Sequence, residues 1–485
     1  MKILVINPMS TLTRNVVRDV LYGCWCAGRR IGGGTVPPFG LLQIATVLEQ
    51  DSKENSVTFV DCQAEQIPSQ RLAERAADFE CVIASTSTMS FKEDAAVMNE
   101  FKKNNPRLKT ILFGSHPTFM PEHSLTEPGI DICVRHEPEF IIRDLIRALR
   151  NQDDQWKNVL GINYKDTEGK KVFNPRYPPY QLDELPLPNT DLLPKVDYFN
   201  PLVRRLPYIT TVTSKGCPAR CIFCTAPYFD DVNIRYKSID YLKREITHYI
   251  EKGYREIYFR DDTFFVNKTR DQEFCRWILD SKVDISWICN TRVSTVRTDR
   301  ELLELAHRAG CHTVKIGVES GVQEILNNLR KGQTVGDCQT VFGWMKEIGI
   351  NSHAHVMLGN PGDTKQTIEK TIEYVLRLEP KTATFGICTP YPGTPLFDEV
   401  AKKCPELLDG TDSDFSKLHT SGTYNEYFTH LKKTELEYFV RTAYRKFYLR
   451  PSYIVSRLSE MRDVYNFRRV SLAATNVFRF SLSGE

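Results

Sequence analysis

The sequence holds 485 residues, of which 41% are hydrophobic and 26% charged, with a formal net charge of +3. These values are typical of a folded globular protein with two or three domains, and they exclude a disordered chain. Because 64 Lys and Arg are balanced by 61 Asp and Glu, no basic surplus predicts nucleic acid or a membrane surface as a partner. The expected ligand is a small neutral or mixed-charge molecule.

The amino-terminal stretch MKILVINPMS lacks the apolar segment of a signal peptide, and no run of about 18 apolar residues occurs in the sequence. We therefore expect a cytoplasmic protein. In a compartment that keeps thiols reduced, the 14 cysteines predict buried apolar side chains plus one metal site rather than a disulfide framework.

Residues 1–150 alternate short apolar runs with helical patterns, which predicts a doubly wound, Rossmann-like parallel sheet. The predicted strands are 2–6, 57–62, 81–85, 109–114 and 131–135. Residues 151–207 are expected to form a linker, because the stretch 175–207 contains eight prolines, which interrupt helices and central strands.

A second alternation occupies residues 208–400, with predicted strands at 208–213, 256–260, 284–289, 313–318, 351–358 and 382–388. Six strand-helix units predict a partial, TIM-like (β/α)6 barrel whose chemistry lies at the carboxyl ends of the strands. Residues 401–485 are expected to be mainly helical, with a helix over 432–451.

Three cysteines, Cys217, Cys221 and Cys224, follow the first strand of this barrel in a C-x3-C-x2-C spacing. Thiolates this close together are ligands for zinc or for an iron–sulfur cluster. A structural zinc site needs four ligands, and the loop offers no fourth Cys or His. Three thiolates on a four-iron cluster would leave one iron open for another ligand, and simple packing or zinc binding is the alternative.

The stretch SKGCPARCIFC resembles the cluster motif of the radical SAM superfamily, and the resemblance continues through FRDDTF (259–264), NTRV (290–293), KIGVESG (315–321), LGNPGDT (358–364) and PYPGTPLF (390–397). It implies a [4Fe-4S] cluster on the three cysteines. It also implies that S-adenosylmethionine binds the open iron and is cleaved reductively to a 5′-deoxyadenosyl radical. The chain is similar to the branch of the family with a cobalamin-binding amino-terminal domain.

Strand periodicity adds candidate contacts for S-adenosylmethionine. Glu319 lies at the carboxyl end of its predicted strand, where a carboxylate can accept hydrogen bonds from a ribose. Asn290 and Arg292 share a face of another strand, and Arg can bind a carboxylate with two parallel bonds. A solvated surface pair is the alternative for these two residues.

Further contacts follow from the family motifs. Asp261 or Asp262, or the adjacent backbone, is expected to bind the methionine ammonium group, although paired acids in a loop are often merely solvated. Gly359 would let the backbone approach adenine. Phe223, beside the last thiol, is expected at the cofactor as well. His353 and His355 share a strand face and could contact substrate or simply pack in the core.

In the amino-terminal domain, GSHPTFMPEHSL (114–125) resembles the cobalamin loop of the family and STSTMS (85–90) the strand end that faces the corrin. The expected cobalamin contacts are Ser85, Thr86, Gly114 and His116. The sequence departs from the family at four positions: Gln63 and Gln66 replace the lower axial histidine and the glycine of a D-x-H-x-x-G motif, and His136 and Pro138 replace the glycines of a Gly-Glu-Gly-Glu segment. A vestigial cobalamin domain is therefore an alternative.

The resemblance implies a cobalamin-dependent enzyme that methylates an unactivated carbon of a small natural product or lipid precursor, with an external electron donor of the flavodoxin or ferredoxin type. The alternative is a cobalamin-independent dehydratase, eliminase, rearrangement or cyclisation enzyme. A methylthiotransferase would need a second cluster, for which Cys24, Cys26, Cys62 and Cys81 could serve, but its surrounding motif and RNA-binding barrel are missing. A non-enzymatic electron carrier would not need Arg292 or Glu319.

Overall fold

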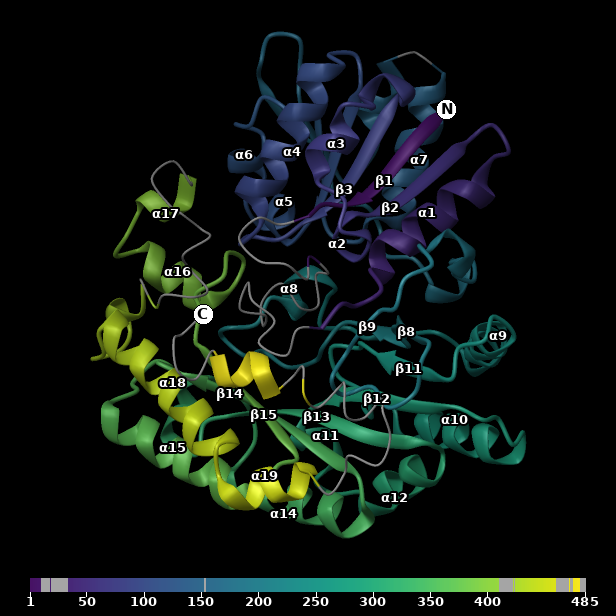
Figure 1. Ribbon diagram of the computed structural model, residues 1–485. Helices are drawn as coiled ribbons and strands as arrows, with labels where there is room; N and C mark the ends of the chain where they lie inside the picture. The colour runs from purple at the N-terminus through teal and green to yellow at the C-terminus, as the bar shows by residue number, and fades with distance from the viewer. Residues whose placement is uncertain are drawn as a thin grey trace.

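The computed structural model describes residues 1–9, 18, 34–151, 154–409, 422, 424–458, 471 and 474–479. Two large sheets organise this part of the chain, one in an amino-terminal domain and one in a barrel-like domain below it in Figure 1. Among the described residues, no helix is long and apolar enough to cross a membrane. Cys24 and Cys26 lie outside the described residues.

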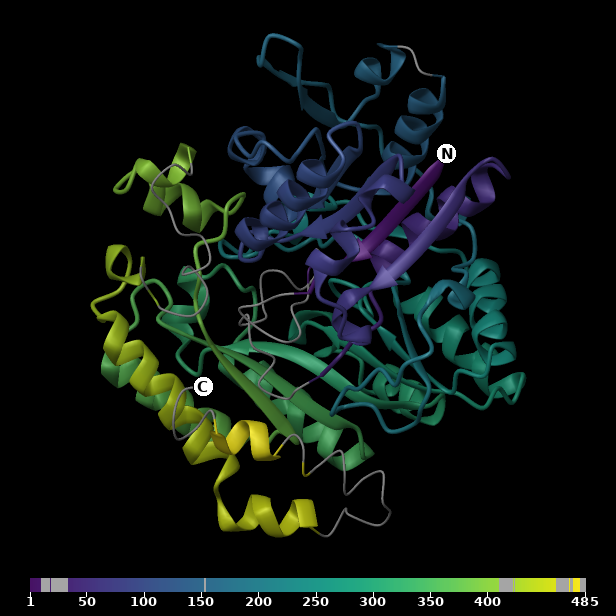
Figure 2. The same cartoon turned by 45° about the horizontal axis from the view of Figure 1, so that its top comes forward.

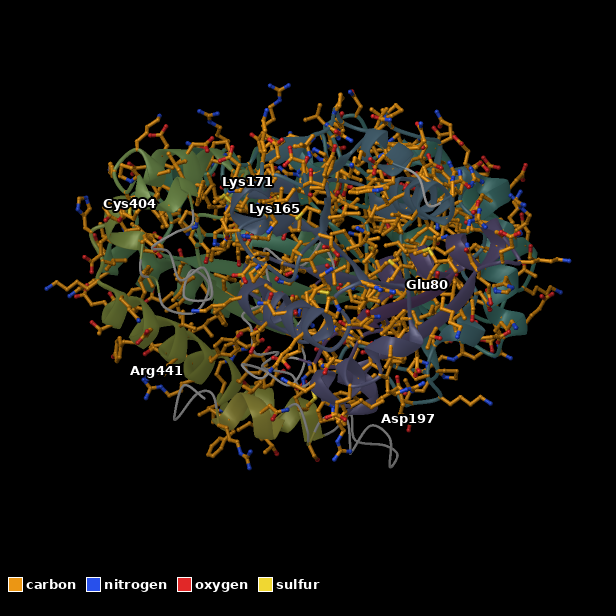
Figure 3. The ribbon with its side chains drawn as sticks, turned by 90° about the horizontal axis from the view of Figure 1, so that it is seen from above. Glu80, Lys165, Lys171, Asp197, Cys404 and Arg441 are labelled. Carbon is orange, nitrogen blue, oxygen red and sulfur yellow. The ribbon has the colours of Figure 1, made fainter. Side chains whose placement is uncertain are left out.

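The amino-terminal domain has a seven-stranded sheet with the order β2-β1-β3-β4-β5-β6-β7. Its strands are β1 (Lys2–Asn7), β2 (Ser56–Asp61), β3 (Cys81–Thr86), β4 (Lys109–Gly114), β5 (Ile132–Val134), β6 (Ile162–Lys165) and β7 (Lys171–Phe173). β1 to β5 are parallel, as the strand-helix alternation predicts. β6 and β7 are antiparallel, and Figure 3 shows Lys165 and Lys171, which are partners in this pair.

The last two strands lie inside the segment predicted as a linker. They form a hairpin whose turn contains Gly169 at φ 81°. The hairpin precedes the first proline of the Pro-rich stretch, Pro175, so nothing in its sequence prevents ladder hydrogen bonds. The sheet therefore continues past residue 150, and the Pro-rich connection is shorter than expected.

Helices cover both faces of this sheet. Helices α1 (Phe39–Asp51) and α7 (Pro138–Arg150) bury one apolar cluster with the strands, and α3 (Ser69–Ala73) and α4 (Phe91–Asn104) bury a second cluster on the other face. Shorter helices follow strand ends: α2 (Cys62–Glu65), α5 (Ser115–Phe119) and α6 (Pro121–Ser124). The sheet is therefore doubly wound, as the sequence predicts.

The second domain has a six-stranded sheet with the order β15-β14-β13-β12-β11-β8, all parallel. Its strands are β8 (Tyr208–Thr211), β11 (Glu256–Phe259), β12 (Ser286–Thr291), β13 (Cys311–Glu319), β14 (Asn351–Leu358) and β15 (Thr382–Ile387). β8 and β15 do not pair with each other, so the barrel is open. The fold class predicted from the sequence, a partial (β/α)6 barrel after a Rossmann-like domain, is confirmed.

Helices line the outer side of the curved sheet (Figures 1 and 2). They are α9 (Ile239–Glu251), α10 (Lys268–Asp280), α11 (Val293–Val296), α12 (Arg300–Arg308), α13 (Gln323–Asn328), α14 (Val335–Ile348) and α15 (Lys365–Leu378). The loop after β8 adds a small antiparallel pair, β9 (Ser214–Lys215) with β10 (Arg235–Tyr236), and one turn of helix, α8 (Ala226–Phe229).

The described part of the carboxyl-terminal region contains four helices: α16 (Pro395–Ala401), α17 (Glu406–Asp409), α18 (Lys433–Tyr448) and α19 (Pro451–Leu458). Helix α18 lies along the edge strand β15. The Tyr448 hydroxyl donates to the Ala383 carbonyl at 2.6 Å and accepts from the Ala383 amide at 3.0 Å, and the Tyr444 hydroxyl accepts from the Phe385 amide at 3.2 Å. These hydroxyls occupy edge groups that another chain could otherwise pair with.

Gly114 ends β4 with φ 126° and ψ −162°, a backbone conformation that is essentially restricted to glycine. A Cβ atom there would lie 2.0 Å from the Thr86 carbonyl oxygen at the end of the neighbouring strand. β3 and β4 can therefore end side by side only because residue 114 has no side chain.

Gly114→Ala is expected to lower the free energy of unfolding by about 2–5 kcal/mol, because backbone strain and a steric clash add. Gly169→Ala is the matched control, since Gly169 also has positive φ but has open space around its Cβ position, and it should cost only about 1 kcal/mol. Denaturant titrations of both variants measure the difference; equal losses would contradict the clash.

Candidate active site

The three cysteines lie in a loop that hydrogen bonds hold in place at both ends. The Cys217 amide donates to the Asp231 carbonyl at 3.1 Å, and the Ile222 amide donates to the Leu329 carbonyl at 3.2 Å. Cys217 and Cys221 are buried, and Cys224 is half-buried. All three thiols line one cavity of about 120 Å³.

The described residues contain no group of three or more His, Cys, Asp or Glu arranged around a single point as ligands of one metal ion. Three thiolates can bind three different irons of a four-iron cluster, whereas a structural zinc site needs four ligands. Burial, with a smaller contribution from the Asp262 carboxylate, raises the pKa of Cys217 to about 11, so metal binding at this thiol must release a proton.

The carboxyl ends of the barrel strands, where the sequence predicts the chemistry, supply much of the remaining lining. The cavity brings together most of the residues expected to bind S-adenosylmethionine: Phe223, Asp261, Asp262, Asn290, Arg292 and Glu319. The lining also includes four charged residues that sequence reasoning did not select as site residues: Asp230, Arg260, Lys315 and Lys331. Lys331 follows helix α13 on a loop, and no spacing pattern links it to the strand ends.

Glu319 ends β13 at φ 62°, in the left-handed region that is uncommon for a side-chain-bearing residue. Its Oε1 accepts from the Lys331 ammonium group at 2.6 Å. Its Oε2 is buried and has no hydrogen-bond partner among the described residues. Burying a carboxylate oxygen without a hydrogen-bond donor costs free energy. A ligand hydroxyl in the cavity would donate the missing hydrogen bond.

Arg292 donates from Nη1 to the Cys221 sulfur at 3.2 Å and from Nη2 to the Lys331 carbonyl. The Asn290 side chain accepts from the Tyr258 hydroxyl at 3.1 Å. The alternative, a solvated surface pair, is therefore wrong for these two residues, because Arg292 is in contact with a cysteine sulfur and Asn290 with a barrel-interior tyrosine.

The two adjacent acids after β11 have different environments. Asp261 accepts from the Thr213 amide at 3.1 Å, from the Thr213 hydroxyl at 2.7 Å and from the Ser214 hydroxyl at 2.6 Å. Asp262 accepts from the Gly216 amide at 3.3 Å. Asp261 therefore fixes the turn that precedes the cysteines, whereas Asp262 contacts the cysteine loop from within the cavity.

His353 and His355 face the barrel interior, and only His355 lines the cavity. Their Nδ1 atoms lie 2.7 Å from the Thr382 hydroxyl and 2.8 Å from the Thr384 hydroxyl, respectively. Burial, together with the neighbouring Lys315 ammonium group, holds the pKa of both imidazoles well below the ordinary value. Both histidines are therefore neutral hydrogen-bonding groups.

Gly359 has the expected positive φ, 73°, but it is not among the residues that line the cavity. A Cβ there would meet Leu436 at 2.7 Å, and the Gly359 carbonyl accepts from the Asn425 side chain at 2.9 Å. Its missing side chain makes room for the carboxyl-terminal region in this structure.

In the amino-terminal domain, Ser85, Thr86 and Gly114 lie together at the carboxyl ends of β3 and β4. His116 is fully buried, with its ring 4.1 Å from the Phe91 ring and its Nε2 atom 2.8 Å from Nδ1 of His123. Burial holds the pKa of His116 well below the ordinary value. His116 therefore contributes to the interior of the domain.

The structure explains how the two substituted glycine positions are tolerated. His136 has φ 59°, so it adopts the left-handed conformation that favours glycine; its amide donates to the Thr118 hydroxyl at 2.9 Å. Pro138 is the first residue of α7, where an amide hydrogen has no partner within the helix. Neither substitution therefore disrupts the backbone of this segment.

The carboxyl edges of the two sheets face each other. Tyr198 donates to Asp61, at the end of β2, at 3.0 Å, and the rings of Phe119, which ends α5, and Phe229 of α8 lie 6.1 Å apart. Nδ1 of His136 lies 3.1 Å from the Phe229 carbonyl oxygen. The edge expected to bind cobalamin therefore lies against the cysteine loop.

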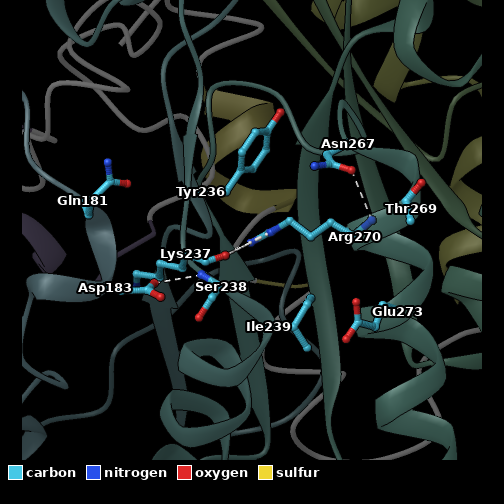
Figure 4. Close-up of a pocket in the computed structure, with 10 residues that line it drawn as sticks. All are labelled: Gln181, Asp183, Tyr236, Lys237, Ser238, Ile239, Asn267, Thr269, Arg270 and Glu273. Carbon is cyan, nitrogen blue, oxygen red and sulfur yellow. Dashed lines mark hydrogen bonds between the residues drawn. The ribbon is translucent and has the colours of Figure 1, made fainter.

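A second hollow, of about 620 Å³, lies beside the amino-terminal ends of α9 and α10 (Figure 4). Arg270 crosses it and donates from Nη2 to the carbonyls of Lys237 and Thr213, both at 3.0 Å. None of the three cysteines lines this hollow. Its arginine supports the turn before the cysteine loop from the outside.

Comparisons with known proteins agree with this geometry. Residues 211–375 match the family model described as the radical SAM superfamily, and residues 31–146 match the model of the B12 binding domain. An uncharacterized methyltransferase of Pyrococcus horikoshii is 32% identical over 438 residues, which cover 89% of this chain and 92% of that protein. The anaerobic magnesium-protoporphyrin IX monomethyl ester cyclase of Rubrivivax gelatinosus is 27% identical over 387 residues, which cover 78% and 68% of the two chains.

Solved structures share the fold. TsrM from Kitasatospora setae, a radical S-adenosylmethionine methyltransferase solved with cobalamin and a [4Fe-4S] cluster, has a TM-score of 0.64 at 17% identity, covering 84% of this chain and 78% of its own. OxsB, a cobalamin-dependent S-adenosylmethionine radical enzyme, has a TM-score of 0.69 at 15% identity, covering 100% and 73%. The chain therefore shares its overall fold with these proteins.

Protein reconstituted anaerobically should hold about four irons per chain, and replacing Cys217, Cys221 and Cys224 together by Ala should abolish iron binding. The matched control is Cys62→Ala with Cys81→Ala, two buried cysteines of the amino-terminal domain, which should leave the iron content unchanged. Iron analysis decides the outcome: a full cluster in the triple variant, or a large loss of iron in the control, would contradict this assignment.

Glu319→Gln and Arg292→Lys should each weaken S-adenosylmethionine binding about ten- to a hundredfold, the value of one charge-assisted hydrogen bond, with iron content unchanged. Glu379→Gln is the control, because Glu379 forms an ion pair of similar length, 2.8 Å with Lys346, on the exposed surface. Binding titrations followed by the spectrum of the reduced cluster measure the affinity. Wild-type affinity in both site variants would remove these residues from the binding site.

Proposed function

Because the chain belongs to the radical SAM superfamily, in the branch that carries a B12 binding domain, we propose that it is a cobalamin-dependent methyltransferase acting on an unactivated carbon of a small natural product or lipid precursor. The observation that carries this proposal is that two sheet edges face each other. One edge has the cysteine loop and the polar groups at the strand ends, and the other is the edge expected to bind cobalamin. A methyl donor and a radical generator must lie next to the same substrate carbon, and this arrangement brings their two sites together.

The residues present fit the implied cofactors. Three thiols line one cavity, and Glu319 lines it too, with a buried Oε2 that has no hydrogen-bond partner among the described residues. At the other edge, small side chains end β3 and β4, and the His136–Pro138 segment keeps its backbone conformation. When bound, the cluster with S-adenosylmethionine supplies a hydrogen-abstracting radical, and methylcobalamin supplies the methyl group.

We assign roles to the residues as follows. Cys217, Cys221 and Cys224 hold the cluster, and Phe223 packs beside it. Glu319 binds the ribose hydroxyls through its unsatisfied oxygen, with Lys331 orienting its carboxylate. Arg292 and Asn290 bind the methionine carboxylate.

For the methionine ammonium group, Asp262 is the better candidate of the two acids. Asp261 already accepts hydrogen bonds from Thr213 and Ser214, whereas Asp262 lies in the cavity beside the Cys217 loop. We propose Asp262, or the backbone next to it, as the ammonium contact. Gly359, if it meets adenine, does so only through a rearrangement of the Asn425 contact.

On the cobalamin side, we propose Ser85, Thr86 and Gly114 as corrin contacts, with His116 shaping the loop from inside the domain. Gln63, at the position of the axial histidine, donates from its side-chain amide to Asn7 at 2.8 Å. An amide held in this way is a poor ligand for cobalt. We therefore propose that cobalamin binds without a nitrogen ligand from the protein.

The reaction needs an electron from outside the site, so we propose an external donor of the flavodoxin or ferredoxin type and a cytoplasmic setting. The near-neutral net charge favours a small-molecule substrate over nucleic acid. Arg260, Lys315 and His355 line the cavity toward the barrel interior and give it polar groups for such a substrate.

Apo-protein incubated with hydroxocobalamin should retain one cobalamin through desalting, and the reduced cob(II)alamin spectrum should lack the splitting of a nitrogen lower ligand because Gln63 is bonded to Asn7. Free cob(II)alamin with its own base bound is the positive control for that splitting. Turnover should consume two S-adenosylmethionine molecules per product, one yielding 5′-deoxyadenosine and one S-adenosylhomocysteine. No retained cobalamin, together with 5′-deoxyadenosine formed without S-adenosylhomocysteine, would support the cobalamin-independent alternative instead.

A further inference from the structure

A buried ion network joins the amino-terminal domain to the start of the cysteine loop. Lys215 donates from its ammonium group to Glu139 at 2.7 Å and to Glu137 at 3.3 Å. Arg235 donates to the other oxygen of Glu137. The Tyr180 hydroxyl donates to Glu139 at 2.7 Å. We call these five residues the interdomain ion network.

The network is shielded from water. The side chains of Lys215, Glu137 and Glu139 are 11%, 9% and 4% exposed. The Lys215 ammonium group forms an ion pair with each of the two carboxylates. Burial would raise the pKa of Glu139, but the ion pair with Lys215 and the hydrogen bonds from Lys215 and Tyr180 together outweigh it and lower that pKa. Both members of the central pair are therefore charged.

The network lies next to the thiols along the chain. Lys215 ends β9, two residues before Cys217. It is the register partner of Arg235 on β10, so the two basic side chains start from neighbouring backbone positions. Glu137 and Glu139 flank Pro138 at the start of α7. The same segment contacts the far side of the loop, where the His136 imidazole meets the Phe229 carbonyl. Residues 136–139 thus hold the cysteine loop on both of its sides.

Stability alone is a weak reason for such a network. Desolvation of charges cancels much of their attraction, so a buried ion pair is often no more stabilising than apolar side chains of the same volume. What an ion pair with several directed hydrogen bonds adds is a fixed distance and orientation. Apolar contacts such as Phe119 with Phe229 would permit sliding between the two edges.

We propose that the interdomain ion network is a positioning device that fixes the cysteine loop, and hence the cluster, at one separation from the cobalamin-binding edge. This inference rests on the proposed function. Glu137, Glu139 and Lys215 are positioning residues in this account, because they act through the loop backbone and touch neither substrate nor cofactor. They set the gap within which the substrate carbon must reach both sites.

The test measures the separation directly. Reduced holoenzyme contains two paramagnetic centres, cob(II)alamin and the reduced cluster, and pulsed dipolar EPR reports the distribution of distances between them. Wild-type protein should give one narrow distance. Lys215→Met, which keeps chain length and removes charge, should broaden or shift it, and Glu139→Gln should do so to a smaller extent.

Glu256→Gln is the matched control. Glu256 is a buried carboxylate at the opposite end of β11, bonded to the Arg204 and Arg205 amides, to Ser286 and to His312. Its variant should lose thermal stability without changing the distance. An altered distance in this control would overturn the proposal, because the substitution of any buried carboxylate would then have the same effect.

A neutral quadruple variant separates positioning from stability. Lys215→Met alone leaves two carboxylates buried without their ammonium partner, whereas adding Glu137→Gln, Glu139→Gln and Arg235→Met removes all four charges of the network and should restore the thermal midpoint. The proposal expects the distance to stay broad in the quadruple variant. A narrow wild-type distance in this folded variant would overturn it.

If the wild type retains no cobalamin, the proposed function fails, and hydrogen exchange decides the network on its own. Exchange in segments 213–231 and 134–140 of the cluster-loaded protein should rise in the neutral quadruple variant and stay unchanged in Glu256→Gln. Unchanged exchange in the quadruple variant would overturn the positioning role whatever the cofactor content.

Discussion

The position of the cysteine loop depends on the buried carboxylate of Asp261. It joins the end of β11 to the turn after β8 by accepting hydrogen bonds from the amide and hydroxyl of Thr213 and the hydroxyl of Ser214. A buried carboxylate without donors would be strongly unfavourable, so this turn cannot move without a large cost. Arg270 holds the Thr213 carbonyl from the outer side. The thiols, which begin four residues after Thr213, are therefore placed by the barrel itself.

Parallel sheets impose the next constraint. Their strands all end at one edge, so loops that carry chemistry must gather there. This chain has two such sheets, and the contacts of Tyr198 with Asp61, Phe119 with Phe229 and Lys215 with Glu139 bring their carboxyl edges together. The open barrel can pack against the amino-terminal domain because both of its edge strands are covered. Helix α18 covers β15. At β8, the Tyr208 and Thr210 hydroxyls donate to the carbonyls of Thr35 and Pro37.

The strands and both domain folds could be predicted from the sequence because each signal is local: apolar runs of strand length, turn residues and alternation with helices. The strand-end residues Arg292 and Glu319 could be predicted for the same reason. Long-range partners could not. Lys331 forms its ion pair with Glu319 from a loop, and the Asn425 side chain donates to the carbonyl of Gly359. Strands β6 and β7 extend a sheet for which the local sequence pattern predicted no strand after β5. The burial of His116 depends on packing with Phe91, which no periodicity encodes.

In the segment that corresponds to Gly-Glu-Gly-Glu, the backbone conformation is more informative than the residue types. His136 and Pro138 remove both glycines, which on sequence alone argues for a lost site. In the structure His136 adopts the left-handed conformation that favours glycine, and Pro138 begins a helix, where an amide hydrogen has no partner within the helix. The two acids that remain, Glu137 and Glu139, are the groups that contact Lys215 and Arg235. In this chain, residues other than glycine therefore adopt suitable backbone conformations at the two glycine positions. The two acidic residues form the contact between the two domains.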